Sequence, residues 1–157
     1  MAERNASRRP GGSQVRDYMT PNPQALDVNH SLLDAVLLLR RASLRHIPIL
    51  ENGHLAGVLT DRDVARFAPS ILLPLPAEEY NRVFEETPVG KVMTRNPLST
   101  TPDTPLAEAV DVLYRNRLGC LPVLQGTQLV GIITVTDLLR ALHDLIAPPP
   151  PVSASAE

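Results

Sequence analysis

The sequence predicts an α+β fold in which two tandem β-α-β-β-α repeats pack about a pseudo-two-fold axis. The first observation is length, because 157 residues make one compact domain or two very small ones that share a core. The second is an internal repeat, since Pro48 and Pro122 are 74 positions apart and Asp63 and Asp137 have the same separation. The third is that apolar residues change from helical spacing to short extended runs at the same point of each copy.

The repeat keeps its register over most of the chain. The segment Val15–Pro23 lies over Val89–Pro97, and both contain the pattern Met-Thr-x-Asn-Pro. Roughly a third of the positions in copy one are identical to their partners in copy two. One copy of about 55 residues buries too little surface to be stable by itself. We therefore expect the open sheet faces of the two copies to pack together.

The first helix of each copy is predicted from its capping residues and its apolar spacing. In copy one, Ser31 and Asp34 have the spacing of a capping box. In copy two, Thr104 is the expected N-cap and Pro105 the expected first helical residue. Apolar residues at i, i+3, i+4 and i+7 then form one buried stripe. The stripes are Leu32, Ala35, Val36 and Leu39 in copy one, and Leu106, Ala109, Val110 and Leu113 in copy two.

A short extended segment precedes each of these helices, and a β-hairpin follows it. The turn Glu51–His54 contains Asn-Gly, a strong hairpin signal, and copy two has a turn that contains Gly126. The second helix of each copy is expected to begin at Thr60 and at Thr134. The expected extended segments are Gln24–Val28, Ile47–Leu50 and Leu55–Leu59 in copy one, and Leu98–Thr101, Leu121–Leu124 and Leu129–Ile133 in copy two.

Composition shifts predict where the repeats begin and end. Proline-rich sequence follows copy one, and four consecutive prolines begin the last part of the chain. Within the connection, Ala77–Glu85 is compatible with a short helix. The predicted organisation is a flexible tail at 1–13, repeat one at 14–68, a linker at 69–87, repeat two at 88–146 and a disordered proline-rich tail at 147–157.

Composition also argues against several classes of protein. The net charge is −2 and aromatic residues are only 3%, so we expect no nucleic-acid partner. No apolar run approaches 18 residues, so we expect no membrane span. The single cysteine, Cys120, and the scattered histidines argue against a disulfide framework and a metal site. We expect Cys120 to be a small buried hydrophobic residue, and the reducing cytoplasm to be the compartment.

A motif of the form Gly-x-x-Thr-x-x-Asp ends the second hairpin strand of both copies, at Gly57–Asp63 and Gly131–Asp137. Together with the repeated Met-Thr and the Pro-Ile or Pro-Val of the preceding strand, it resembles the tandem CBS domain, a regulatory module first named in cystathionine β-synthase. The resemblance covers almost the whole chain between the two tails. Within that family, Arg45–Pro48 and Gly119–Pro122 are similar to the acetoin-utilisation AcuB-like proteins.

The resemblance implies a non-catalytic protein that binds an adenosine-containing regulatory ligand (AMP, ADP or ATP) in the cleft between its repeats, and that forms a homodimer through its CBS pairs. The motif residues suit such a ligand. A helix N-terminus offers unpaired N–H groups to phosphate, and the hydroxyls of Thr60 and Thr134 are further donors. The carboxylates of Asp63 and Asp137 can accept hydrogen bonds from both ribose hydroxyls.

Residues beside the motifs complete the expected ligand-binding set. Copy one carries two arginines and a histidine where copy two carries Gly119, Cys120 and Thr136, so we expect phosphates to lie nearer to copy one. The full expected set is Thr60, Asp63, Thr134, Asp137, Arg45, His46, Pro48, Arg62, Cys120, Leu121, Pro122 and Thr136.

Two alternatives stay open at this point. Thr-x-x-Asp at a helix start is also a capping box, which stabilises a fold by about 0.5–2 kcal/mol. Capping and ligand binding are compatible, because the same carboxylate can cap the empty protein and contact ribose in the complex. The other alternative is a ligand-free interaction or dimerisation scaffold, in which side chains fill the cleft between the repeats.

Overall fold

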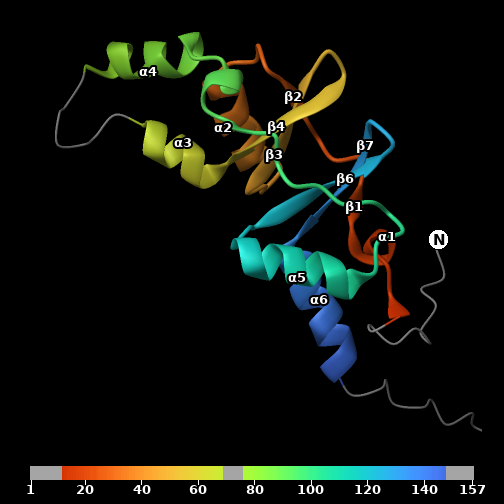
Figure 1. The fold of residues 1–157 in the computed structure, drawn as a ribbon. Coiled ribbons are helices and arrows are strands. Elements are labelled where there is room, and N and C mark those ends of the chain that lie inside the picture. Colours follow the sequence, from red (N-terminus) through yellow and green to blue (C-terminus); the bar gives the residue numbers. More distant parts are fainter. Residues whose placement is uncertain (1–11, 69–75, 148–157) are drawn as a thin grey trace, which may run out of the picture.

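The computed structural model describes residues 12–68 and 76–147, and its two halves follow the two sequence copies (Figure 1). The predicted α+β architecture is confirmed. The predictions for residues 1–11, 69–75 and 148–157 lie outside the described residues. Copy one of the sequence forms α1 (Val15–Tyr18), β1 (Thr20–Pro21), β2 (Leu26–Asp27), α2 (Leu32–Arg41), β3 (His46–Glu51), β4 (His54–Thr60) and α3 (Asp61–Phe67). The connection forms α4 (Ala77–Glu86), and copy two forms the 3-10 turn η2 (Val89–Lys91), β5 (Thr94–Arg95), α5 (Leu106–Asn116), β6 (Cys120–Gln125), β7 (Gln128–Thr134) and α6 (Val135–Ile146). The first half of the structure is the sheet that contains β3 and β4 with the helices packed on it, and the second half is the sheet that contains β6 and β7 with its helices.

Each half is built on a small sheet whose centre is the predicted hairpin. One sheet has the order β2-β3-β4-β5 and the other the order β1-β7-β6. In both hairpins the antiparallel register shifts once, after Ile49 and after Val123. The extended segment of copy two contributes a single parallel bridge, Thr100 with Val123, at the position where β2 pairs with β3 in copy one. The predicted hairpins are therefore present in both copies. The extended segment expected before the first helix is shorter than predicted, with a strand at Leu26–Asp27 in copy one and the bridge at Thr100 alone in copy two.

The two halves exchange their first strands. β1 belongs to the first copy by sequence but pairs with β7, where Thr20 lies opposite Ile132. β5 pairs in the same way with β4, where Thr94 lies opposite Val58. The helical turns before these strands cross as well, so α1 packs near α6, and Figure 1 shows it beside the second half. Each sheet is thus completed by a strand from the other copy.

The core residues record the same exchange. Val15 of α1 is fully buried in the core of the second half, and Val89 is fully buried in the core of the first. A third, smaller cluster joins Val58, Cys120 and Ile132, and it lies where β4 meets β7. The expectation that Cys120 is a small buried hydrophobic residue is confirmed. The two copies therefore share one continuous fold and not merely a contact surface.

The start of the first helix agrees with the prediction in copy one (α2) and differs from it in copy two (α5). Ser31 and Asp34 form the predicted capping box at α2. The predicted cap at Thr104 is wrong, because α5 begins at Leu106 and its N-cap is Pro105, which makes no side-chain capping bond. The hydroxyl of Thr104 lies instead 2.8 Å from the hydroxyl of Thr101 and accepts its backbone N–H at 3.3 Å. Since those contacts engage Thr104, its side chain does not cap the helix.

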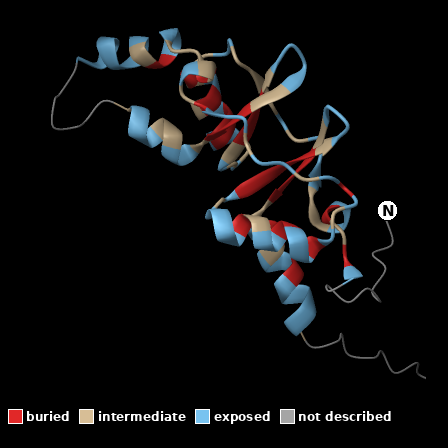
Figure 2. Cartoon of the chain, in the orientation of Figure 1, coloured by how far each residue is buried: buried red, intermediate tan, exposed pale blue. Residues whose placement is uncertain are grey.

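The helix proposed within the linker is present as α4, Ala77–Glu86. Its single buried residue, Phe84, packs into the core of the first half beside α2. The rest of α4 is mostly exposed (Figure 2). Phe84 is stacked at a tilt on Tyr80, with ring centroids 5.0 Å apart. The connection between the copies is therefore part of the first half's packing. No helix in the described ranges has both the length and the apolar content needed to cross a bilayer.

Candidate functional site

Both Thr-x-x-Asp motifs stand where a central strand passes into a helix. At β4–α3, the N–H and the hydroxyl of Thr60 donate to Oδ2 of Asp63 at 2.9 and 2.7 Å, and the Asp63 N–H donates back to the hydroxyl at 3.1 Å. At β7–α6, the corresponding distances between Thr134 and Asp137 are 2.9, 3.0 and 3.4 Å. The motifs therefore form capping boxes in this structure, and each uses only one oxygen of its carboxylate for that purpose.

A backbone hydrogen bond places the residue before each hairpin next to its motif. The first N–H of α3, from Asp61, donates to the carbonyl of Arg45 at 3.1 Å. The first N–H of α6, from Val135, donates to the carbonyl of Gly119 at 3.0 Å. Residues that are about 15 positions apart in sequence are thus neighbours, as the ligand-binding prediction requires.

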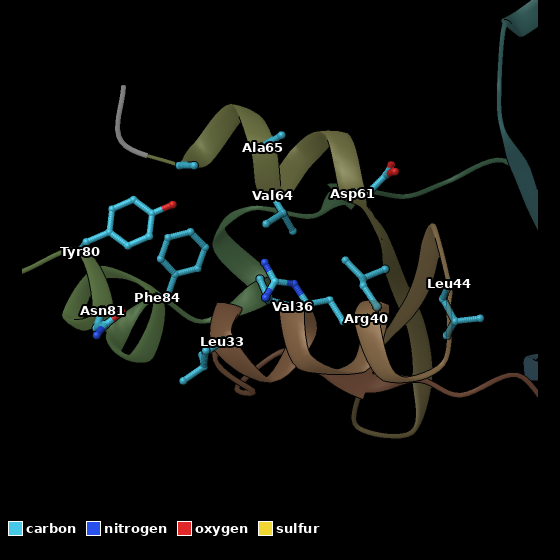
Figure 3. A pocket seen from close by; sticks show the side chains of 12 residues that line it. Leu33, Val36, Arg40, Leu44, Asp61, Val64, Ala65, Tyr80, Asn81 and Phe84 are labelled. Atoms are coloured by element: carbon cyan, nitrogen blue, oxygen red, sulfur yellow. The ribbon is translucent and has the colours of Figure 1, made fainter. Parts of the chain in front are cut away.

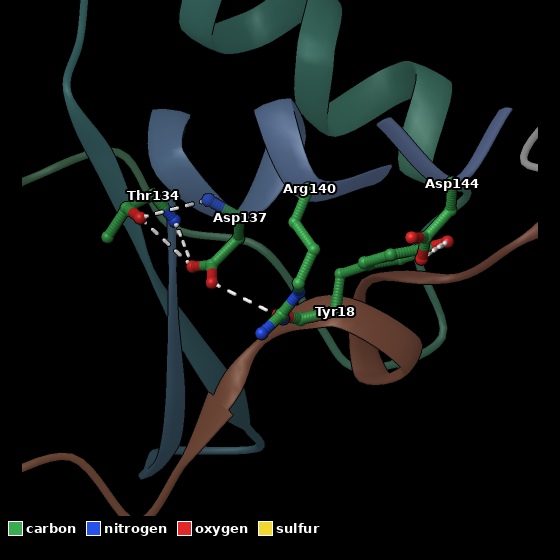
Figure 4. Close-up of polar contacts among 5 residues, drawn as sticks. All are labelled: Tyr18, Thr134, Asp137, Arg140 and Asp144. Atoms are coloured by element: carbon green, nitrogen blue, oxygen red, sulfur yellow. Dashed lines mark hydrogen bonds and ion pairs between the residues drawn. The ribbon is translucent and has the colours of Figure 1, made fainter. Parts of the chain in front are cut away.

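The second carboxylate oxygen differs between the copies. Oδ1 of Asp137 lies 3.4 Å from the Arg140 guanidinium, which also donates to the carbonyl of Tyr18 at 2.7 Å (Figure 4). Arg140 also lies over the Tyr18 ring, and the Tyr18 hydroxyl donates to Asp144 at 3.3 Å. Burial, followed by the charge of Asp144, raises the pKa of Tyr18. These contacts hold α6 against α1, and they engage the second carboxylate oxygen of Asp137.

Asp63 has no equivalent arginine contact among the described residues. Arg66 stands at the position of Arg140 but is exposed, and within the described ranges Oδ1 of Asp63 has no hydrogen-bond partner. Asp63 is half-buried whereas Asp137 is buried. The carboxylate in copy one is therefore the more available of the two for an incoming hydroxyl group.

His46 marks the place where the two copies meet beside the motifs. A Cβ added to Gly119 would lie 2.5 Å from Nε2 of His46, so the ring of one copy occupies the space that a side chain would fill in the other. Burial lowers the pKa of His46, the charges of Arg45 and Arg62 lower it further, and the nearby carboxylate of Asp61 opposes them. His46 is thus favoured in its neutral form at this contact.

The charges of copy one include Asp61, which the sequence offers as a possible partner of the two arginines. Arg45 and Arg62 are exposed, as expected for cations that would meet phosphate. Asp61 is the first residue of α3, and its Oδ1 accepts the Arg62 N–H at 2.9 Å. It therefore uses a helix N-terminal donor and adds negative charge where phosphate was expected. The sequence shows Asp61 directly before Arg62, so this effect was readable from the motif.

The remaining predicted residues differ in accessibility. The side chains of three of them, Pro48, Leu121 and Pro122, are fully buried in the hairpin strands. A ligand bound to this conformation of the protein could therefore contact only the residues around them. Cys120 is also buried, and burial raises the pKa of its thiol to about 12. Thr136 is exposed on the first turn of α6.

Two surface hollows lie on the outer helical faces, and each reaches one residue inside a motif, Asp61 or Val135. One, of about 490 Å³, is bounded by α2, α3 and α4 (Figure 3). The other, of about 660 Å³, lies between α5 and α6. Neither is lined by Thr60, Asp63, Thr134 or Asp137. Among the described residues, no group of three or more His, Cys, Asp or Glu is arranged to hold a metal ion.

The duplicated fold and its paired junctions agree with the comparison to known families. A family model for the CBS domain matches residues 15–70 and 89–144. The chain belongs to the CBS domain family. Each CBS match begins at the helical turn that crosses to the other half and ends in or just after the second helix of its copy.

Individual relatives cover most of this CBS pair. The CBS domain-containing protein YhcV of Bacillus subtilis is 31% identical over 126 residues, which are 80% of this chain and 83% of that protein. A Vibrio cholerae protein named for acetoin utilization (AcuB) has a crystal structure with a TM-score of 0.70 and 32% identity, covering 85% of this chain and 92% of its own. CBSX2, crystallised in complex with AMP, has a TM-score of 0.69 and 28% identity, covering 83% and 96%.

Proposed function

We propose that this protein is a non-catalytic regulatory module that binds an adenosine-containing nucleotide (AMP, ADP or ATP) between its two CBS repeats. The observation that carries the proposal is the pair of Thr-x-x-Asp junctions, which keep one carboxylate oxygen outside each capping box. The AMP complex of the related CBSX2 supports an adenosine ligand. The module is proposed to act in the cytoplasm as a homodimer. The ligand would bind one of two conformations of the module more tightly than the other, and a partner protein would respond to the resulting shift between them.

The two junctions are proposed to bind with unequal strength. A ribose hydroxyl can reach Oδ1 of Asp63 directly, whereas at Asp137 it must displace or share the Arg140 guanidinium. We therefore propose that the copy-one motif contributes more to affinity. The exposed Arg45 and Arg62 would meet the phosphates there, against the opposing charge of Asp61.

The test is calorimetric titration of AMP, ADP and ATP against the full chain and single variants. Asp63→Ala removes the ribose acceptor and should weaken binding roughly 10- to 100-fold. Asp137→Ala should weaken it less. The matched control is Asp34→Ala, because Asp34 forms the same capping box with Ser31 at α2 but lies away from the junctions. It should cost about 1 kcal/mol of stability and leave affinity unchanged.

Three outcomes decide the matter. Loss of affinity in Asp63→Ala but not in Asp34→Ala supports a direct contact with the ligand. Equal loss in both variants would mean that the carboxylates act only through helix stability. No binding of any of the three nucleotides by the wild-type chain would refute the proposed ligand class.

A ligand-free scaffold is the second candidate function, and one observation favours it. Val58, Cys120 and Ile132 pack together where β4 meets β7, and neither hollow described above lies between the motifs. Failure of every nucleotide to bind or to raise the unfolding temperature would favour the scaffold, since a ligand specific for the folded state must stabilise it.

A further inference from the structure

One guanidinium nitrogen links the motif of copy two to α1. Nη2 of Arg140 donates to the carbonyl of Tyr18 at 2.7 Å and lies 3.4 Å from Oδ1 of Asp137. Figure 4 shows the guanidinium between the Asp137 carboxylate and the backbone of Tyr18. We call these two contacts the Arg140 bridge. Because a single nitrogen makes both contacts, a movement of Arg140 away from Asp137 also changes its contact with Tyr18.

The Arg140 bridge engages the oxygen of Asp137 that a ribose would need. Oδ2 of Asp137 accepts the N–H and the hydroxyl of Thr134 in the capping box, so Oδ1 is the oxygen left for a ligand. The side chain of Asp137 is only 12% exposed, whereas that of Arg140 is 56% exposed. A ribose hydroxyl that approaches Oδ1 from solvent therefore competes with the guanidinium, and Arg140 is the partner with room to move away.

Tyr18 depends on side-chain contacts for its position on α6. The chain is fixed on both sides of it, since Val15 is fully buried in the core of the second half and β1 pairs with β7. Tyr18 itself is half-buried, and among the described residues its hydrogen bonds to α6 involve the side chains of Arg140 and Asp144. Loss of the Arg140 bridge would therefore loosen Tyr18 locally while Val15 and β1 stay in place.

Copy one does not contain this arrangement, although it has the same fold. The equivalent positions, 74 residues away, place Val92 for Tyr18 and Arg66 for Arg140. Val92 has neither a ring nor a hydroxyl, and it packs against the core of the first half. Arg66 is exposed. The fold therefore does not require the Arg140 bridge, which is specific to the second junction.

We propose that Arg140 couples the nucleotide site of copy two to α1, because contact of a nucleotide with Asp137 and the Arg140 bridge exclude one another. A nucleotide at the second junction displaces the guanidinium, and Tyr18 is released from α6 and becomes accessible to a partner protein. The coupling is reciprocal, so a protein that binds the released Tyr18 tightens nucleotide binding at copy two by the same factor. The inference rests on the proposed function, and it names α1 as the element that responds to occupancy.

The first test is hydrogen exchange of the full chain with and without saturating AMP. The reporter is the N–H of Met19, which donates to the Val15 carbonyl at 2.9 Å and closes α1. AMP should speed its exchange in the wild type, because local opening needs no global unfolding. In Arg140→Ala the exchange should be fast already and insensitive to AMP. The matched control is Arg66→Ala, the same substitution at the equivalent position of α3, which should respond to AMP as the wild type does.

The second test is calorimetric, and its expected sign differs from that of a merely structural role. It uses the Asp63→Ala background, in which copy two dominates binding. There Arg140→Ala should tighten AMP binding about threefold to tenfold, since an exposed ion pair no longer competes with the ribose. A merely structural role of Arg140 would leave the affinity unchanged or lower it. Circular dichroism establishes that each variant is folded, and Arg140→Gln is a second variant of the same contact.

The outcomes separate this inference from the proposed function. A wild-type chain that does not bind AMP would refute the proposed function and the coupling together. AMP binding that leaves exchange at Met19 unchanged would overturn the coupling alone, and so would unchanged or weaker AMP binding by Arg140→Ala. In both of these cases the ligand site would remain.

Discussion

The crossing strands should make two equivalent glycines unequally sensitive to a single methyl group. A Cβ on Gly57 would lie 2.5 Å from Sδ of Met93 and 2.7 Å from the carbonyl oxygen of Thr94. A Cβ on Gly131 would lie 2.6 Å from Sδ of Met19 but 3.1 Å from the carbonyl oxygen of Thr20. A side-chain sulfur can move, whereas the carbonyl belongs to a strand held by β4 or β7.

The structure gives the expected order and size of the effect. Met93 is buried, so its sulfur has less room to move than that of Met19, which is half-buried. Gly57→Ala should therefore push β5 from β4 and cost about 2–3 kcal/mol, the upper range for overpacking, and Gly131→Ala should cost about 1 kcal/mol. For a domain of this size, about 1 kcal/mol lowers the unfolding temperature by about 2–4 °C.

Urea and thermal unfolding of both variants measure these differences. Gly12→Ala is the control, because its added Cβ would meet nothing within 4 Å, and it should be close to neutral. Equal destabilisation of the two variants, or a larger effect at Gly131, would refute the reasoning that strand crossing is tighter at β4–β5 than at β7–β1.

Three further predictions concern single side chains. Burial keeps the folded-state pKa of His46 below 6.5, so the free energy of unfolding should fall as pH drops below 6.5, where the unfolded chain binds a proton that the folded chain does not. Urea unfolding at several pH values should show a smaller fall in His46→Gln than in the wild type. An identical fall in both proteins would contradict this role of His46. Cys120, with a thiol pKa of about 12, should resist thiol reagents at pH 8 until urea unfolds the chain, so rapid labelling of the folded protein would be inconsistent with its burial. Phe84→Ala should cost about 3 kcal/mol in urea unfolding and Phe84→Leu clearly less, whereas no cost would mean that α4 is not part of the core.

The repeats, hairpins and capping boxes could be predicted because each depends on residues close together in sequence. The Asn-Gly pair at 52–53 sets its turn, since both residues have positive φ, and Ser31 reaches Asp34 within one helical turn. The wrong prediction at Thr104 also concerns contacts between residues close together in sequence. The Thr104 hydroxyl contacts Thr101 and does not cap α5.

The candidate site was predicted less completely. Both motif aspartates and both threonines were identified from their spacing, but the difference between Asp63 and Asp137 was not. That difference depends on Arg140 and on Tyr18, which are 122 positions apart. The contact of His46 with Gly119 also lies between the two copies, so it could not be predicted from the residue pattern within one copy.

The sequence by itself determined the repeated unit, its local elements and the two motif positions, because periodicity, turn residues and caps act within a few residues. Only the tertiary structure decided that β1 and β5 exchange sheets. A two-residue strand is too short to contain a pattern that selects the strand it pairs with. In a duplicated chain, β4 at Val58 and β7 at Ile132 are equivalent pairing sites for β1 and for β5. The tertiary structure also decided which helical face is covered, because Phe84 could join the core only once α4 had a groove to enter.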